Sequence, residues 1–158
     1  MIHLEQAQSL KTLQLQSDSF LENGIIPMRY TCDGVNVSPS LTVNTIPENT
    51  ISLAVIMEDP DAPINTWVHW LVWNIPVSHQ ISENSKRGVQ GLNDFCKNFY
   101  CGPCPMGGTH RYVFKVYALD ALLNLKGNTK KYELERSMSG HVIAYGEIIG
   151  LYRRKKAI

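Results

Sequence analysis

The sequence has little charge, and the charges it has nearly cancel. Lys, Arg, Asp and Glu make up 18% of the 158 residues, and the formal net charge is +1. Capture of nucleic acid through the overall electrostatic field needs a large positive excess, so we expect no nucleic-acid partner. The one basic run is Arg153-Arg154-Lys155-Lys156. This run could contact nucleic acid or a membrane surface. We interpret it instead as a solubilising tail, because no aromatic residue lies between its charges.

Long apolar stretches are also missing. No segment reaches the roughly 18 consecutive apolar residues of a membrane helix, and residues 1–15 lack the charged-then-apolar pattern of a secretory leader. We therefore expect no integral membrane segment and a cytoplasmic location. The apolar fraction of 44% is nevertheless large enough for a core. The length is typical of one domain, which we expect to span residues 1–158.

Cysteines are few, and three of the four lie close together. Cys96, Cys101 and Cys104 have the spacing C-x4-C-x2-C, and Cys32 lies far upstream. With His110 nearby, this spacing overlaps the ligand patterns of iron–sulfur and zinc sites. Prolines on both sides of Cys104 turn the segment sharply, which argues against a metal centre. We interpret the cysteines as reduced thiols of a cytosolic loop, expect no metal and no cofactor, and leave a disulfide between two of them open.

Alternating and continuous apolar segments predict a mainly β protein. Residues 51–57 are almost continuously apolar, which is typical of a strand buried on both faces. A short helix is predicted over residues 132–141, with Asn128 or Thr129 as its cap. Short strands separated by turn signals, with one or two short helices, favour a two-sheet β-sandwich. The predicted strands cover residues 12–20, 41–43, 51–57, 66–75, 112–119 and 144–152.

A loop rich in glycine and proline, residues 100–112, is the first candidate site segment. It reads Tyr-Cys-Gly-Pro-Cys-Pro-Met-Gly-Gly-Thr-His-Arg-Tyr and leads directly into a predicted strand. Glycines let a ligand approach the backbone, and their free N–H groups can receive an anion. His110 adds a switchable positive charge and Arg111 a permanent one. We interpret this loop as one wall of an anion site.

Two further segments have unusual content for their position. Asp59-Pro60-Asp61-Ala62-Pro63 follows a buried strand, and its prolines fix the placement of the two carboxylates. His69 lies within a Trp-rich strand, where alternation puts it on one face with Trp67, Leu71 and Trp73. Burial there would lower the pKa of the imidazole unless an acid lies beside it.

We expect these three segments to converge on one pocket. An aspartate would then orient a histidine, while two imidazoles and loop N–H groups face a small anion. Arg111 has an alternative role, because a bidentate salt bridge from it would brace the Asp59-Pro60-Asp61 turn.

Taken together, these motifs resemble the phosphatidylethanolamine-binding protein family, in its bacterial branch of Raf-kinase-inhibitor-like proteins. Each motif is weakly specific, but the set occurs in the correct order over about residues 12–152. The matching segments are Asp33-Gly34-Val35-Asn36-Val37-Ser38-Pro39, Asp59-Pro60-Asp61-Ala62-Pro63, Trp67-Val68-His69-Trp70-Leu71-Val72-Trp73-Asn74-Ile75-Pro76, Gly102-Pro103-Cys104-Pro105, His110-Arg111-Tyr112 and Gly140-His141-Val142.

The resemblance implies a β-sandwich of that family's type with a small pocket for phosphate or phosphorylated head groups. It also implies a possible protein partner such as a kinase, since eukaryotic members are kinase inhibitors, and a possible homodimer. Residues 104 and 106–109 depart from the more proline-rich loop of the family, which affects the pocket rim. The pocket positions carried over are Asp59, Pro63, Trp67, His69, Gly102, Pro105, His110 and Tyr112.

A hydrolase is the alternative hypothesis for the same residues. Asp59 with His69 or His110 would form a base and its orienting group. No G-x-S-x-G motif supplies a serine nucleophile. Cys104 or Cys101 would act as the nucleophile only if His110 lay within hydrogen-bond distance of its thiol and the pKa of that thiol were lowered. We favour a binding protein for a small phosphorylated or carboxylated ligand, because a placed nucleophile is missing.

Overall fold

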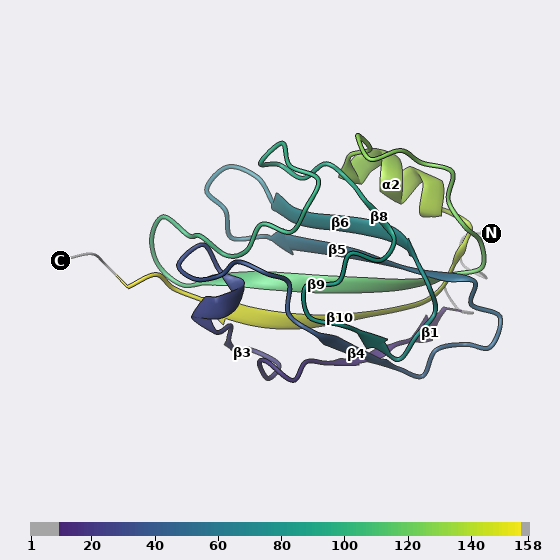
Figure 1. The fold of residues 1–158 in the computed structure, drawn as a ribbon, viewed down its shortest axis with the longest axis horizontal. Helices are drawn as coiled ribbons and strands as arrows, with labels where there is room; N and C mark the ends of the chain where they lie inside the picture. Colours follow the sequence, from purple (N-terminus) through teal and green to yellow (C-terminus); the bar gives the residue numbers. More distant parts are fainter. Residues whose placement is uncertain (1–9, 156–158) are drawn as a thin grey trace.

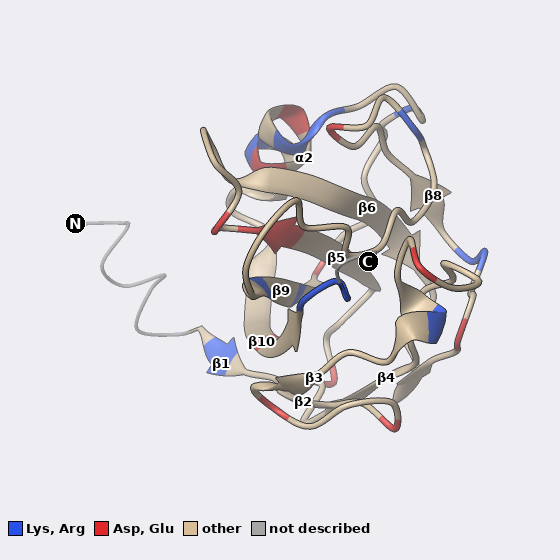
Figure 2. Cartoon of the chain, turned by 90° about the vertical axis from the view of Figure 1, so that its left-hand side faces the viewer, with Lys and Arg blue, Asp and Glu red and all other residues tan. Residues whose placement is uncertain are grey.

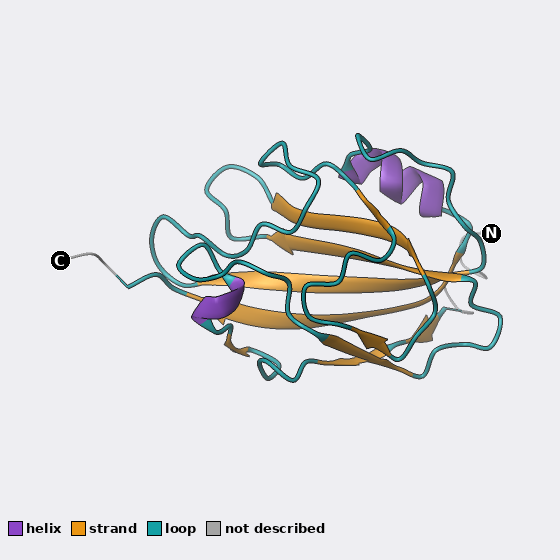
Figure 3. Ribbon diagram, viewed as in Figure 1, coloured by secondary structure: helices purple, strands orange, loops and turns teal. Residues whose placement is uncertain are grey.

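The computed structural model describes residues 10–155, which form two β-sheets and one α-helix (Figures 1 and 3). The larger sheet has seven strands in the order β1-β10-β9-β5-β6-β8, with β3 paired to β10, and the smaller sheet has the order β2-β4-β7. The expected two-sheet, mainly β fold is confirmed. Residues 1–9, part of the segment 1–15 in which no secretory leader is expected, and Lys156 of the basic run lie outside the described residues.

The elements have the following bounds. The larger sheet contains β1 (Lys11–Thr12), β3 (Gly24–Ile25), β5 (Ser52–Asp59), β6 (Trp67–Ile75), β8 (Val89–Gln90), β9 (His110–Leu119) and β10 (Val142–Tyr152). The smaller sheet contains β2 (Gln14–Gln16), β4 (Leu41–Asn44) and β7 (Gln80–Ile81). The helices are the 3-10 helix η1 (Met28–Tyr30) and the α-helix α2 (Lys131–Met138).

Strand β5 lies at the centre of the fold, between two apolar layers. All of its residues are buried, as its continuous apolar run predicts. Val55 and Met57 belong to the core cluster between the two sheets. Ile56 faces the other way and packs in a second cluster with Leu134 of α2. Each fully buried side chain of this size contributes about 1.5–3 kcal/mol, so the end of β5 is a rigid place to hold a functional group.

Two local predictions are wrong. The strand expected over residues 12–20 is two strands, because the chain crosses from one sheet to the other at Leu13: β1 pairs with β10 and β2 with β4. The helix begins after Lys130, which acts as N-cap without a side-chain hydrogen bond, and neither Asn128 nor Thr129 caps it. In this case packing of the buried Leu134 outweighs capping.

The loops that follow β5, precede β9 and follow β10 gather at one end of the molecule, at the left of Figure 1. Antiparallel pairing of β5 with β9 brings the C-terminus of one strand beside the N-terminus of the other. Residues 59–63 and the loop of residues 100–112 therefore meet at this end, and His69 lies beside them because antiparallel β6 begins where β5 ends. Within residues 10–155, no helix is long and apolar enough to cross a membrane.

Candidate anion-binding pocket

A pocket of about 340 Å³ lies where β5 ends and where β6 and β9 begin. Seven of the eight predicted site residues line it, and Gly102 does not. Four further residues complete the wall: Ala62 of the turn of residues 59–63, Cys104 and Met106 of the loop expected to form the rim, and Phe95, which no sequence motif indicates. The lining residues are Asp59, Ala62, Pro63, Trp67, His69, Phe95, Cys104, Pro105, Met106, His110 and Tyr112.

The one carboxylate in the pocket wall holds one of its histidines. Asp59 is the last residue of β5, and its Oδ2 lies 2.6 Å from Nδ1 of His110, the first residue of β9. Both side chains are largely buried, with exposed fractions of 5% and 13%. Asp59 Oδ1 accepts the N–H of Asp61, so both carboxylate oxygens are fixed. This pair fixes the orientation of the imidazole and places a negative charge beside its Nδ1.

Arg111 braces the turn that follows Asp59. Its Nε and Nη2 donate to the Asp61 carboxylate at 3.0 and 2.8 Å, and its backbone N–H donates at 2.9 Å. These bonds lower the pKa of Asp61 to about 2. Arg111 itself is exposed and is absent from the pocket lining. The bracing role considered from sequence is therefore the observed one.

His69 is placed by an irregularity in β6 that the sequence pattern did not reveal. Glu58 pairs with Val68 and Met57 pairs with Trp70, so one residue of β6 has no partner on β5. The extra residue changes the alternation: His69 shares the pocket side with Trp67, as predicted, but the predicted common face with Leu71 and Trp73 is wrong. Leu71 and Trp73 pack on the side of α2. His69 instead lies edge-to-face against Tyr112 at 5.3 Å, on the pocket side.

Burial controls the protonation of His69. Its side chain is 3% exposed, and desolvation lowers its pKa below the ordinary value. The Cys101 carbonyl, 2.6 Å from Nδ1, offsets part of this effect. His69 is thus the neutral imidazole of the pocket at neutral pH, and His110, beside Asp59, is the one with a counter-ion.

The two histidines share one tautomer in their neutral forms. Each Nδ1 faces an oxygen acceptor, Cys101 O for His69 and Asp59 Oδ2 for His110, so Nδ1 carries the proton. Neither Nε2 has a hydrogen-bond partner among the described residues. A neutral Nε2 accepts a hydrogen bond, and a protonated one donates. The pocket therefore offers one acceptor and one switchable donor to a ligand.

The sequence of this chain is similar to those of known proteins along most of its length. The sequence profile described as phosphatidylethanolamine-binding protein matches residues 16–153. The chain belongs to this family. A UPF0098 protein of Pyrococcus horikoshii is 47% identical, over 96% of this chain and 80% of its own length. A UPF0098 protein of Methanothermobacter thermautotrophicus is 44% identical, over 90% of this chain and 99% of its own length.

Solved structures of family members share the fold. The crystal structure of a putative phosphatidylethanolamine-binding protein homolog from Chlamydia trachomatis has a TM-score of 0.88 and 38% identity, and the match covers 92% of this chain and 99% of that one. YbcL of E. coli, described as a new member of the mammalian family, has a TM-score of 0.83 and 32% identity, covering 90% and 99% of the two chains.

The hydroxyl of Tyr112 is the most unusual polar group in this family member's pocket. The residue is fully buried, and its hydroxyl has no hydrogen-bond partner among the described residues. Burial raises its pKa above the ordinary value, and the charge of Asp59 adds to the effect. An unpaired buried hydroxyl costs about 1–3 kcal/mol. The hydroxyl is therefore a buried polar group without a partner within residues 10–155, directly behind the pocket wall.

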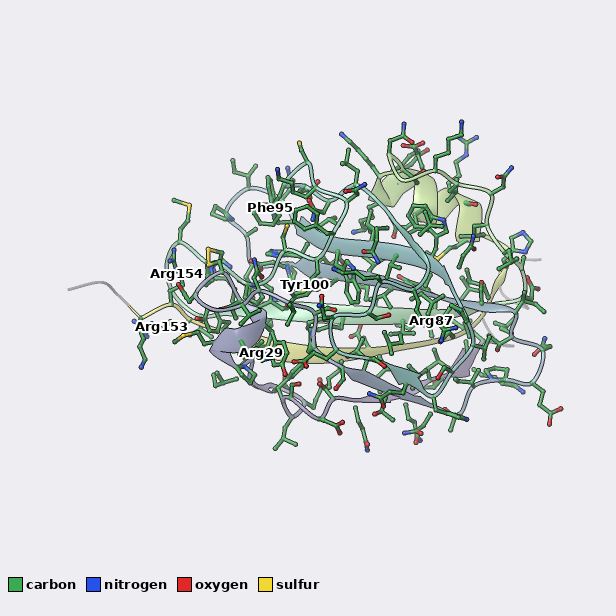
Figure 4. The ribbon with its side chains drawn as sticks, viewed as in Figure 1. Arg29, Arg87, Phe95, Tyr100, Arg153 and Arg154 are labelled. Carbon is green, nitrogen blue, oxygen red and sulfur yellow. A yellow bond between two sulfur atoms is a disulfide. The ribbon has the colours of Figure 1, made fainter. Side chains whose placement is uncertain are left out.

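An aromatic wall that the sequence analysis missed closes the pocket. Phe95, labelled in Figure 4, packs edge-to-face against Trp67 at 5.6 Å and against His69 at 5.1 Å. The buried Asn93 holds this loop, because its Nδ2 donates to the carbonyls of His69 and Phe99 and its Oδ1 accepts two loop N–H groups. Asn93 and Phe95 lie in a segment without periodicity, so only its length signalled a function.

Gly102 supports the pocket from behind. Its N–H donates to Asn36 Oδ1 at 2.8 Å and is not free for an anion, contrary to expectation. A Cβ at this position would lie 2.1 Å from the Tyr30 carbonyl oxygen. Glycine is therefore required because two backbone segments approach closely.

Cys104 is joined to Cys32 in a disulfide that bridges 72 residues. The expectation of four reduced thiols is wrong for these two, since the fold brings distant loops together. Cys104 then offers no thiol to a Cys–His hydrolase. Cys96 and Cys101 are free, and burial raises the pKa of the Cys101 thiol. Across residues 10–155, no three His, Cys, Asp or Glu side chains are grouped to hold a metal ion.

Proposed function

We propose that the pocket binds the anionic end of a small phosphorylated or carboxylated molecule. The observation that carries this proposal is the pair of imidazoles with both Nδ1 atoms engaged and both Nε2 atoms available. Protonated His110, with Asp59 as counter-ion, donates to one ligand oxygen, and neutral His69 accepts from a protonated one. A phosphate monoanion has both kinds of oxygen.

The rest of the pocket wall is suited to contact an organic group attached to that anion. Trp67, Phe95 and Met106 give it an apolar rim, and Trp67 is 39% exposed at its mouth. Contact with such side chains favours a carbon-containing ligand over the free inorganic ion. A cytoplasmic location, a homodimer and regulation of a kinase or another protein stay predictions of the sequence and the resemblance.

Calorimetric titration tests the proposal. Sulfate has the same charge from pH 6 to pH 8, so a change in its affinity reports the protein. We expect sulfate to bind more weakly at pH 8 than at pH 6, because a protonated imidazole attracts an anion more strongly than a neutral one. His110→Gln should abolish the pH dependence. The control is His79→Gln. His79 lies outside the pocket, and its Nδ1 is 3.0 Å from the Val43 carbonyl oxygen, much as Nδ1 of His69 lies near a carbonyl.

Phosphate and phosphoethanolamine test the role of the second imidazole. Both should bind wild type more tightly than sulfate, because a protonated phosphate oxygen can donate to His69 Nε2. His69→Gln should remove this preference. Absence of binding at millimolar ligand, or equal binding in wild type and both pocket variants, would refute the proposed function.

A further inference from the structure

A second cleft, of about 230 Å³, adjoins the histidine pocket. The segment after β10 forms one wall and the turn before β9 forms the other. Pro105 and Met106 line both hollows, so one short piece of chain separates them. The residues lining the cleft are Pro105, Met106, Gly107, Gly108, Arg153, Arg154 and Lys155.

The cleft is strongly cationic. Three of its residues carry positive charges, and Figure 2 shows this basic segment near the C-terminus at the end of the molecule that faces the viewer. Among residues 10–155, Asp33 is the one carboxylate paired with them, since its Oδ1 accepts hydrogen bonds from Nε and Nη2 of Arg154 at 3.1 and 2.9 Å. Arg153 and Lys155 form no ion pair with any described residue. The cleft therefore keeps a positive excess.

Two adjacent residues, Cys32 and Asp33, each hold one wall of the cleft in place. Cys32 holds one wall through its disulfide to Cys104. The adjacent Asp33 holds the other, through Arg154 and through the hydroxyl of Tyr152 at 2.6 Å. These two contacts lower the pKa of Asp33, which keeps it ionised at neutral pH. The basic segment is thus anchored beside the pocket, and Figure 4 shows Arg153 and Arg154 at that end.

The glycine turn adds backbone donors to these charges. Nothing lies within 4 Å of the Cβ position of Gly107 or Gly108, and Gly108 has a positive φ of 71°. Neither glycine N–H donates to an acceptor among the described residues. Consecutive free amides beside cationic side chains are a recurrent way to bind an anion.

We propose that this cleft is a second anion site and that the protein's ligand carries two anionic groups. One group binds between His69 and His110, the other binds between the glycine turn and Arg153 with Lys155, and the connecting atoms contact Met106. The ligand class is a short linear molecule with two phosphates, or with one phosphate and one carboxylate. This inference rests on the proposed function of the histidine pocket.

The test compares butanediol bisphosphate, with two anionic groups, and methyl phosphate, with one. Calorimetry should show at least about tenfold tighter binding of the bisphosphate to wild type, from the second ion contact. The double variant Arg153→Gln/Lys155→Gln should lose that gain and keep its methyl phosphate affinity within about twofold. Lys86→Gln/Arg87→Gln is the control, since it removes the same charge from exposed positions outside both hollows (Figure 4 labels Arg87).

Backbone and imidazole NMR signals separate failure of this proposal from failure of the proposed function. The bisphosphate should shift both the Gly107 and Gly108 amides and the His69 and His110 imidazoles. Shifts of the imidazoles alone, with equal affinity in the cleft variant, would overturn the cleft and leave the pocket. Shifts of the glycine amides alone would overturn the two-point ligand and the histidine pocket together, and shifts of neither would refute both.

Discussion

Asp59 and His110 meet side chain to side chain, 2.6 Å apart, although 51 residues separate them in the sequence. The contact exists because β5 ends where the antiparallel β9 begins. It puts a buried negative charge behind an imidazole whose other nitrogen is available to a ligand. The proposed chemistry of the pocket depends on this pair more than on any other contact.

Removing the charge of Asp59 should weaken anion binding at low pH. Asp59→Asn keeps the side-chain shape but removes the carboxylate charge that holds His110 Nδ1, so the imidazole is oriented less firmly and we expect sulfate affinity at pH 6 to fall about tenfold. Asp120→Asn is the matched control, because Asp120 also holds a histidine, His141 at 2.9 Å, at an exposed position outside the pocket. Calorimetry at pH 6 measures both. Equal losses in the two variants would contradict the role of Asp59.

Burial of neutral His69 should make the protein less stable in acid. The folded pKa lies below the unfolded value of about 6.5, so below that pH the unfolded chain binds more protons and stability falls as pH falls. At pH above about 6.5 this contribution is flat. His69→Gln should flatten the decline between pH 7 and pH 5, measured by urea unfolding. An unchanged slope would show that His69 is not held neutral.

Gly102 should not tolerate a side chain, in contrast to Gly107. In Gly102→Ala the new Cβ would lie 2.1 Å from the Tyr30 backbone oxygen, and backbone must move to relieve the contact. We expect a loss of about 2 kcal/mol or more in the free energy of unfolding. Gly107→Ala meets nothing within 4 Å and should change stability by less than about 0.5 kcal/mol. Similar losses in both variants would argue against the close approach at Gly102.

Loss of the Cys32–Cys104 disulfide should destabilise the whole fold. A bridge across 72 residues restricts the unfolded chain, for which chain-entropy arguments give roughly 4 kcal/mol. We expect Cys32→Ser/Cys104→Ser, or wild type in a phosphine reductant, to unfold at a correspondingly lower urea concentration. Cys96→Ser is the control, because that thiol is free and exposed. A double variant as stable as wild type would show that the bridge does not constrain the chain.

The long strands and the pocket were predictable because their signals are local or nearly local. The apolar run of β5 and the aromatic strand β9 lie within one or two residues of their predicted bounds. Asp59 and His110 follow from these two strands, because each lies at a strand end. In contrast, β1, β3, β7 and β8 have two residues each, too few for a periodic pattern.

The features that could not be predicted from the sequence depend on contacts between distant segments. The extra residue in β6 is visible only in its register with β5, and it puts His69 on the side opposite Leu71 and Trp73. The disulfide depends on how the loop of Cys32 folds over Cys104. Arg154 looked like part of a solubilising tail because its partner, Asp33, is 121 residues away.

The most direct test of the central claim is an NMR titration of the two pocket imidazoles with and without phosphate. Long-range proton–nitrogen spectra identify which ring nitrogen of each histidine carries a proton. The account predicts that phosphate shifts Nε2 of both His69 and His110, and that it raises the pH at which His110 loses its proton, while His79 is unaffected. Signals of His69 and His110 that stay unchanged at saturating phosphate would contradict the account.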